Sequence, residues 1–285
     1  YGNGGPKREQ IWKQSSKNFN VADVTTTTDG NKTVLTVNYL LAAGNLYIMK
    51  YTIYPDGVVH AGITFTSTDM KAADTEVSEA TLMATFTPGQ DAQRLASSKL
   101  NVPRIGVRFH LPSDMNQVEY FGRGPEENYV DRNAGTLIDL YKTTADNMYF
   151  PYVRPQENGH HTDTRWLTLN KKGGKGLTIY ADKTIGFNAL RNSVEDFDGE
   201  ETVSRPYQWL NRDAGELVHD ESKAKDQLPR KTHINDISPR NFVEVCVDMK
   251  QQGVAGYNSW GARPEPGYNI PANQEYKWGF TIVPR

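Results

Sequence analysis

The sequence Arg-Ile-Gly-Val-Arg-Phe-His-Leu at residues 104–111 alternates between apolar side chains and polar or small ones. Neighbouring side chains of an extended chain point to opposite faces, so such an alternation gives a β-strand one apolar and one polar face. The apolar set is Ile105, Val107, Phe109 and Leu111. We therefore predict a strand at 104–111 that packs this set on a core and turns the other face toward water.

Similar β-forming sequence recurs along the chain. Runs rich in β-branched and aromatic residues, which suit a pleated sheet, occupy 34–39, 46–54, 58–65, 165–169, 176–180, 242–247 and 276–283. Pro55-Asp56-Gly57 predicts a hairpin turn, because Pro presets φ and Gly accepts a positive φ. The best helical candidate is short, around 193–197, with Ser193 as N-cap and two carboxylates in the first turn.

Many short strands and few short helices predict an all-β, antiparallel sandwich. A chain of 285 residues buries roughly three quarters of its unfolded surface, so its stability requires neither a disulfide nor a metal. No internal repeat or shift in composition marks a boundary. We expect a single domain over residues 1–285, with 1–15 as a linker or loop from a preceding domain.

Composition argues against several classes of protein. The 32 Lys and Arg against 34 Asp and Glu leave no excess of cations for a phosphate backbone, so we expect no nucleic-acid partner. No run approaches the ~20 apolar residues of a membrane span. Cys246 is the only cysteine and is predicted to be a core or interface side chain. The first residues lack the charged-then-apolar pattern of a signal peptide and include no initiator Met. We therefore expect this chain to be a piece of a longer protein, and the sequence leaves the localisation of that protein open.

Two pairs of adjacent acidic residues are candidates for glycosidase chemistry, which requires two carboxyl groups flanking one bond. These pairs are Glu126-Glu127 and Glu195-Asp196. Adjacent side chains diverge in an extended chain and cannot flank one bond. We instead expect these carboxylates to lie at turns or to pair with Arg123, Arg132 and Arg191, and we predict no catalytic residue in this chain.

His160-His161, followed by Asp163, raises the question of a metal site. Adjacent histidines diverge in a strand, and His60, His110, His219 and His233 offer no matching pair of ligands. We predict ordinary hydrogen-bonded loop histidines and no metal site. Gly173-Gly174-Lys175-Gly176 lacks the spacing of a phosphate-binding loop and precedes a strand, so it predicts a hairpin turn.

Trp260 lies in a loop-forming sequence, Gly253-Val-Ala-Gly-Tyr-Asn-Ser-Trp-Gly-Ala-Arg-Pro-Glu-Pro-Gly. A large apolar ring in such a loop either packs on the sandwich or is exposed as a binding platform. A Trp ring beside Asn and Ser suits the flat C–H faces and hydroxyls of a sugar. Composition alone leaves both interpretations open.

Three segments together carry a resemblance to a known family: 119–132 (EYFGRGPEENYVDR), 148–166 (MYFPYVRPQENGHHTDTRW) and 257–261 (YNSWG). They resemble the C-terminal domain of the lactase-type, family-two β-galactosidases, and the resemblance extends from about Val34 to the end. It implies an antiparallel two-sheet supersandwich similar to galactose mutarotase. This agrees with the alternation of apolar and polar residues described above.

The resemblance also implies a function. In that family the acid/base and nucleophile glutamates and the catalytic magnesium belong to a separate barrel domain, and sodium is a further candidate ion there. The C-terminal domain contributes one tryptophan to the sugar site, which by motif position is Trp260. The implied partners are the barrel domain of the same chain, a galactoside substrate and, as an oligomer, further copies. No cofactor is expected in this domain.

The sequence departs from the family pattern in two places. The family has an acidic residue two places before Ser259, where this chain has Tyr257, which either loosens the loop or adds a stacking surface. The mixed-charge stretch 204–231 is longer than typical. Two alternatives stay open, an aldose mutarotase that would use Glu157 with His160 or His161, and a free-standing carbohydrate-binding module.

Overall fold

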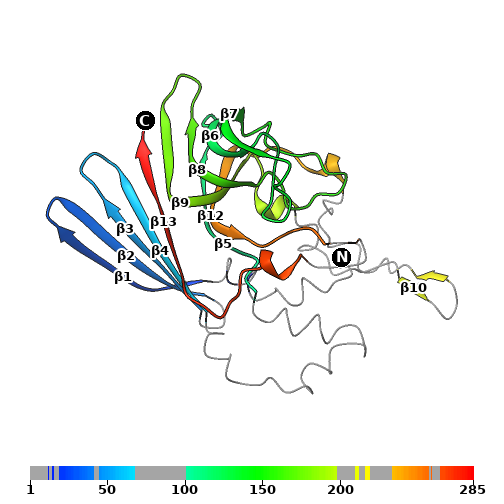
Figure 1. The fold of residues 1–285 in the computed structure, drawn as a ribbon, viewed down its shortest axis with the longest axis horizontal. Coiled ribbons are helices and arrows are strands. Elements are labelled where there is room, and N and C mark those ends of the chain that lie inside the picture. Colours follow the sequence, from blue (N-terminus) through cyan, green and yellow to red (C-terminus); the bar gives the residue numbers. More distant parts are fainter. Residues whose placement is uncertain are drawn as a thin grey trace, which may run out of the picture.

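The computed structural model describes Trp12, Ser15, 19–41, 45–67, 101–197, 209–211, 216–218, 233–256, Asn258 and 264–285. Eleven strands form one hydrogen-bonded, antiparallel network, and the short strands β10 (Trp209–Asn211) and β11 (Glu216–Val218) form a separate hairpin. The predicted all-β, antiparallel fold is therefore confirmed (Figure 1).

The main sheet begins with four strands that are consecutive in sequence. They are β1 (Asn20–Asp29), β2 (Lys32–Leu40), β3 (Leu46–Ile53) and β4 (Val59–Thr66). The C-terminal strand β13 (Tyr276–Pro284) joins β4 to β9 (Gly176–Leu190), and β8 (His161–Asn170), β6 (Gln117–Gly124) and β7 (Leu137–Thr144) follow. Figure 1 shows β13 between the blue N-terminal strands and the green central ones, so the two ends of the sequence build one sheet.

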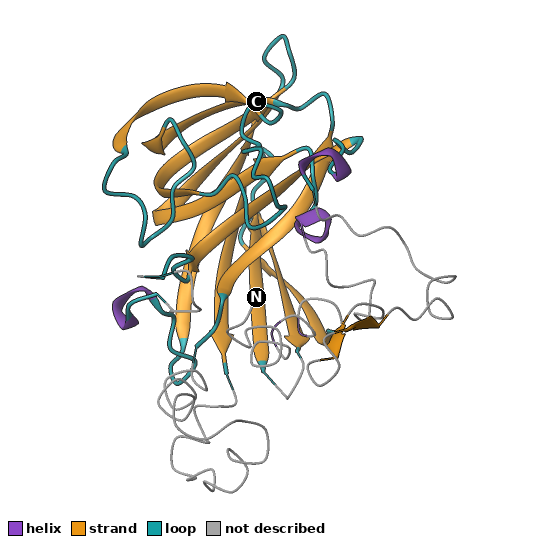
Figure 2. Cartoon of the chain, turned by 90° about the vertical axis from the view of Figure 1, so that its right-hand side faces the viewer, coloured by secondary structure: helices purple, strands orange, loops and turns teal. Residues whose placement is uncertain are grey.

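The 15-residue strand β9 belongs to both layers of the sandwich. Its residues 177–181 pair with β13 and its residues 186–190 pair with β12 (Phe242–Gln251), whereas β8 pairs with both halves. Strand β12 in turn pairs with β5 (Arg104–Pro112). Among the described residues, the loops and the short 3₁₀ helices η2 (Val194–Phe197), η4 (Ile234–Asp236) and η5 (Pro266–Tyr268) lie outside the strands (Figure 2).

The core lies between these layers and follows the predicted alternation. On β5, Ile105 is buried, Val107, Phe109 and Leu111 pack against the core, and Arg108 is exposed. The main cluster includes the fully buried Leu167, Phe187 and Val245, from three different strands. Trp12, in the stretch expected as a linker, packs edge-on against Phe65 and donates a hydrogen bond to the carbonyl of Asn101.

The predicted turns and the short helix are also found. Gly57 has a φ of 84° in the β3–β4 hairpin, and its N–H donates to the carbonyl of Tyr54 at 3.0 Å. Gly173 and Gly174 have φ values of 110° and 97° in the β8–β9 hairpin, which confirms a turn. The segment after Ser193 forms η2, and the Ser193 N–H donates to Asp196 Oδ2 at 3.0 Å.

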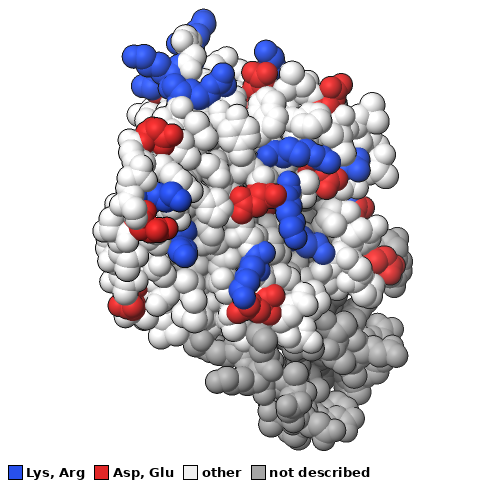
Figure 3. Space-filling view, turned by 60° about the vertical axis from the view of Figure 1, so that its left-hand side comes forward, with Lys and Arg blue, Asp and Glu red and all other residues white. Residues whose placement is uncertain are grey.

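The surface carries charges of both signs. Lys and Arg side chains alternate with Asp and Glu over the centre of the face in Figure 3, and a basic group lies at one end. Within the described parts of the chain, no helix has the length and apolar character needed to cross a membrane.

Candidate functional site

The residue implied to bind sugar, Trp260, lies outside the described residues, as does Tyr257. The segment that leads to it is described as far as Gly256 and is attached to the body of the domain. Gln252 N–H donates to the carbonyl of Pro103 at 2.9 Å, and Gly253 N–H donates to the carbonyl of Tyr268 at 3.1 Å.

Asp131 holds this segment from the other side. Its Oδ2 accepts the N–H of Ala255 at 2.7 Å. A Cβ added to Gly253 would lie 2.4 Å from the same oxygen, so only glycine permits this close approach. Asp131 belongs to the motif 119–132. The structure thus connects this motif to the segment before the motif 257–261, whereas the sequence only indicated that both motifs belong to one family.

We expect Asp131→Ala to loosen this attachment. The Ala255 N–H loses a charged acceptor, an interaction worth about 1.5–3 kcal/mol, so its amide should exchange at least about tenfold faster. Amide hydrogen exchange followed by NMR measures this rate. Asp114→Ala is the matched control, because the Asp114 carboxylate is largely exposed and pairs with Lys171 at the surface. Unchanged exchange at Ala255 would show that Asp131 does not anchor the segment.

The first acidic pair diverges, as predicted. Glu126 is exposed, whereas the Glu127 side chain is only 5% exposed and accepts hydrogen bonds from Arg132 Nη2 at 2.6 Å, from Gly159 N–H at 2.7 Å and from Tyr152. Glu127 therefore fastens the turn after β6 to the loop before β8. The predicted pairing with Arg132 is confirmed.

The second pair diverges too. Glu195 accepts a bidentate pair of hydrogen bonds from Arg108 at 2.6 and 2.9 Å. The buried Asp196 pairs with Arg240. The other two expected arginine pairings are wrong. Arg123 pairs with Asp163 at 2.5 Å because β6 pairs with β8. Arg191 donates to Asp146 and to the carbonyl of Arg240, which lies nearby because β9 pairs with β12.

The adjacent histidines also point to different surroundings, and both are buried. Both are hydrogen-bonded as predicted, although only His160 lies in the loop, because β8 begins at His161. His160 Nδ1 contacts Asn188 Oδ1 at 2.9 Å, and its ring stacks on Tyr129. His161 lies between the carbonyls of Gly159 and Pro125, at 3.1 and 3.2 Å. Burial lowers the pKa of His160 to about 3 and lowers that of His161, so both imidazoles are neutral at pH 7.

The structure does not assemble a metal site from these groups. No cluster of three His, Cys, Asp or Glu side chains able to hold an ion occurs among the described residues. His60 pairs with Asp182 and His110 with Glu244, whereas His219 lies outside the described part. Burial raises the pKa of the Cys246 thiol to about 12, so this side chain is a neutral, buried group, as predicted.

A buried network of charged and polar side chains connects β5 to β12. Arg104 Nη2 donates to Asp248 Oδ2 and to Asn188 Oδ1, both at 2.6 Å, and Nη1 approaches Glu157 Oε1 at 3.4 Å. Asp248 is 1% exposed. Sequence reasoning missed this network, since Arg104 occupies a position of the β5 alternation that was expected to face water.

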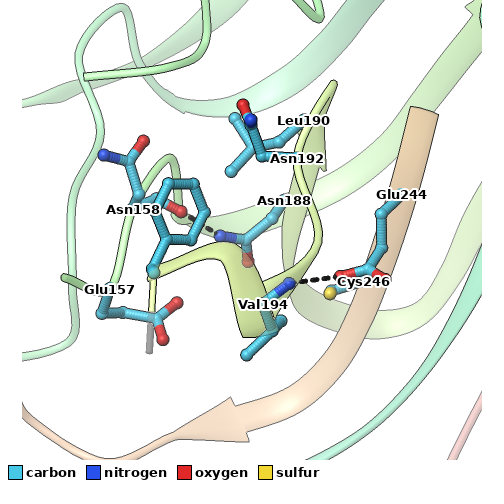
Figure 4. A pocket seen from close by; sticks show the side chains of 9 residues that line it. Glu157, Asn158, Asn188, Leu190, Asn192, Val194, Glu244 and Cys246 are labelled. Carbon is cyan, nitrogen blue, oxygen red and sulfur yellow. Dashed lines mark hydrogen bonds between the residues drawn. The ribbon is translucent and has the colours of Figure 1, made fainter. Parts of the chain in front are cut away.

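A cavity of about 210 Å³ lies next to this network. Its polar lining consists of Glu157, Asn158, Asn188, Asn192, Glu244 and Cys246, as Figure 4 shows. Its apolar lining consists of Leu190, Val194 and Phe197. Of the three residues considered for mutarotase chemistry, Glu157 lines the cavity, while His160 and His161 are not among its lining residues.

The fold defines an antiparallel β-sandwich domain in which many of the described acidic side chains are held in ion pairs. The chain belongs to the β-galactosidase small-chain family, since the model of that family, described as "Beta galactosidase small chain", matches residues 2–282.

Curated relatives are much longer. A β-galactosidase of Priestia megaterium is 29% identical over 287 residues, which cover 99% of this chain and 22% of that protein. A β-galactosidase of Streptococcus thermophilus is 27% identical over 185 residues, 65% of this chain and 15% of that protein. The chain therefore spans about a fifth of the length of the first of these relatives. Among solved structures, an amine oxidase of Aspergillus nidulans aligns over 94% of this chain and 37% of its own, with 12% identity and a TM-score of 0.28, too low to support an inference.

Proposed function

We propose that this chain is the non-catalytic, C-terminal domain of a lactase-type, family-two β-galactosidase that hydrolyses terminal β-D-galactosides. The observation that carries the proposal is the family match over residues 2–282, combined with relatives of which the chain covers only 22% and 15%. Most of such a protein, with room for a catalytic barrel, is then outside this segment.

The chemistry of the described carboxylates supports a non-catalytic role. A retaining glycosidase needs two carboxyl groups about 5–5.5 Å apart, one as acid/base and one as nucleophile. Glu127, Glu195 and Asp196 each hold an arginine instead. The bond-breaking glutamates are proposed to lie in the barrel of the same chain, and homo-oligomer formation is part of the same proposal.

Magnesium, with sodium as a further candidate, is proposed for that barrel and not for this domain. The described residues do not fit such an ion, since they contain no group of three side chains arranged to hold one. No step of the proposed role is therefore routed through a metal in this chain.

Trp260 is proposed to supply an apolar face for the sugar at the active site of the assembled enzyme. The support is its motif position and the firm attachment of the preceding segment to Asp131, Pro103 and Tyr268. Such an attachment suits a loop that must hold a ring against a substrate.

We expect Trp260→Ala in the assembled enzyme to raise KM for a chromogenic β-galactoside about tenfold, because burying an aromatic face is worth about 1.5–3 kcal/mol. Trp260→Phe should recover much of this loss. The thermal midpoint should stay within about 1 °C of the parent value. Unchanged kinetics with a large loss of stability would show that Trp260 packs on the sandwich. Turnover by the 285-residue chain alone, abolished by changing one of its own carboxylates, would contradict the non-catalytic role.

A further inference from the structure

The cavity beside the buried network has the character of a small ligand site. It is bounded by the loop at 157–158, by the end of β9, by η2 and by β12 (Figure 4). Its volume of about 210 Å³ lies below the roughly 300–1,000 Å³ of pockets for drug-sized ligands, so it suits a ligand of about one ring. Ligand sites combine a concave shape with apolar walls and a few convergent polar groups.

Two of the three amides that line the cavity are already paired within the protein. Both ends of the Asn158 amide bond the backbone of Phe150. Asn188 Oδ1 accepts from Arg104 and from His160, and its Nδ2 donates to the carbonyl of Asn158. These amides shape the wall, and each NH₂ group keeps one N–H beyond the one that is already bonded.

Most of the hydrogen-bonding capacity that remains consists of acceptors. Asn192 uses its Nδ2 on the carbonyl of Ser238 at 2.9 Å, and no described residue donates to its Oδ1. Within the described part of the chain, Glu157 has one long contact, from Arg104, and its second oxygen accepts nothing. The Glu244 oxygens accept from Val194 N–H and His110 and retain further lone pairs. A ligand that satisfies this cavity must therefore donate several hydrogen bonds and can also accept from the remaining amide N–H groups.

Both carboxylates of the cavity have partners within the protein. The carboxylate of Glu157 faces the Arg104 guanidinium, and Glu244 faces Arg108 at 3.7 Å as well as His110. Each of these arginines also pairs more closely with a second carboxylate, Asp248 or Glu195, so the apolar walls and the mixed hydrogen-bonding groups, rather than the charge, select the ligand. The apolar walls of Leu190, Val194 and Phe197 suit the C–H face of a ring.

We propose that this cavity binds a neutral polyhydroxyl compound the size of one sugar ring, with its hydroxyls donating to Glu157, Asn192 and Glu244. It would be a second carbohydrate site, built from residues other than Trp260 and independent of the function proposed above. The ring would lie with its C–H face toward Leu190, Val194 and Phe197.

The test is a titration of the ¹⁵N-labelled 285-residue chain with D-galactose and, separately, with D-glucose, observed by NMR. We expect saturable shifts of the Asn158 and Asn192 side-chain amide signals with at least one of the sugars, and a Kd on the order of 1–10 mM. Glu157→Gln should raise this Kd at least fivefold, since it places a donor among the acceptors. Glu126→Gln is the matched control, because Glu126 is exposed and outside the cavity, and it should leave the Kd unchanged.

Three results would overturn the proposal. The first is no saturable shift of either amide signal up to 100 mM of both sugars. The second is tighter binding of 1,4-diaminobutane than of either sugar at these amides, which would indicate a cation site. The third is sugar binding that survives Glu157→Gln and is lost in Trp260→Ala, which would place the sugar on the Trp260 loop. Retention of the Kd in Trp260→Ala supports the cavity, whatever the kinetics of that variant in the assembled enzyme.

Discussion

Arg104→Met is expected to lower the free energy of unfolding by about 3–5 kcal/mol, because it leaves the Asp248 carboxylate buried without its cation. Asp248 is 1% exposed, and its contact with Arg104 Nη2 is 2.6 Å. Methionine replaces most of the aliphatic length of arginine, so the loss reports the missing charge and hydrogen bonds more than a cavity. Urea unfolding at pH 7 measures it.

Two further variants separate the buried pair from a surface effect. Lys277→Met breaks a pair with Glu275 in which both side chains are largely exposed, and it should cost less than about 1 kcal/mol. Adding Asp248→Asn to Arg104→Met should recover part of the loss, since no unpaired charge then remains. A double variant less stable than Arg104→Met would contradict the assignment of the loss to Asp248.

The pH dependence of Arg104→Met gives an independent check. Burial raises the pKa of Asp248 above its ordinary value, and the Arg104 cation opposes this shift. Removing Arg104 therefore raises the pKa of Asp248 further in the folded state. Between the unfolded and the folded pKa, the folded chain holds more protons than the unfolded chain, so its stability falls as pH rises. The difference in the free energy of unfolding between the parent and Arg104→Met should thus become smaller as the pH is lowered from 7 toward 4.

His160 is expected to make the fold sensitive to acid. Burial, and to a lesser extent the cation of Arg104, lowers its pKa to about 3, against about 6.5 in an unfolded chain. Between these values the unfolded chain binds a proton that the folded chain does not. The contribution of His160 to the free energy of unfolding is therefore fully present above pH 6.5. It is lost as the pH falls, by up to about 1.4 kcal/mol per pH unit.

Replacing His160 by Asn isolates this contribution. Urea unfolding between pH 7 and pH 5 gives the free energy of unfolding at each pH. In the variant this free energy should change with pH by about 1 kcal/mol per pH unit less than in the parent, whatever the loss of stability at pH 7. His233→Asn serves as the control, because the His233 side chain is 74% exposed. Equal slopes in the His160→Asn variant and the parent would show that His160 is not held neutral by the fold.

The sequence by itself determined the local structure of this protein. The alternation at 104–111 predicted β5, Pro55-Asp56-Gly57 predicted the β3–β4 turn, and Ser193 predicted the start of η2; each is found. These features depend on side-chain direction and backbone preference over a few residues, which the sequence states directly. The three motif segments also indicated a β-galactosidase family, and the match of the β-galactosidase small-chain model over 2–282 confirms this coarser statement.

Only the tertiary structure decided which charged groups meet. Arg104 and Asp248 are 144 residues apart and become neighbours because β5 pairs with β12, and Arg123 meets Asp163 because β6 pairs with β8. Local sequence carries no information about such register. The pairing of β8 with β9 places the buried His160 beside Asn188, and the pairing of β9 with β12 brings together two walls of the cavity. The burial of a histidine and the existence of a site are therefore properties of the assembled layers.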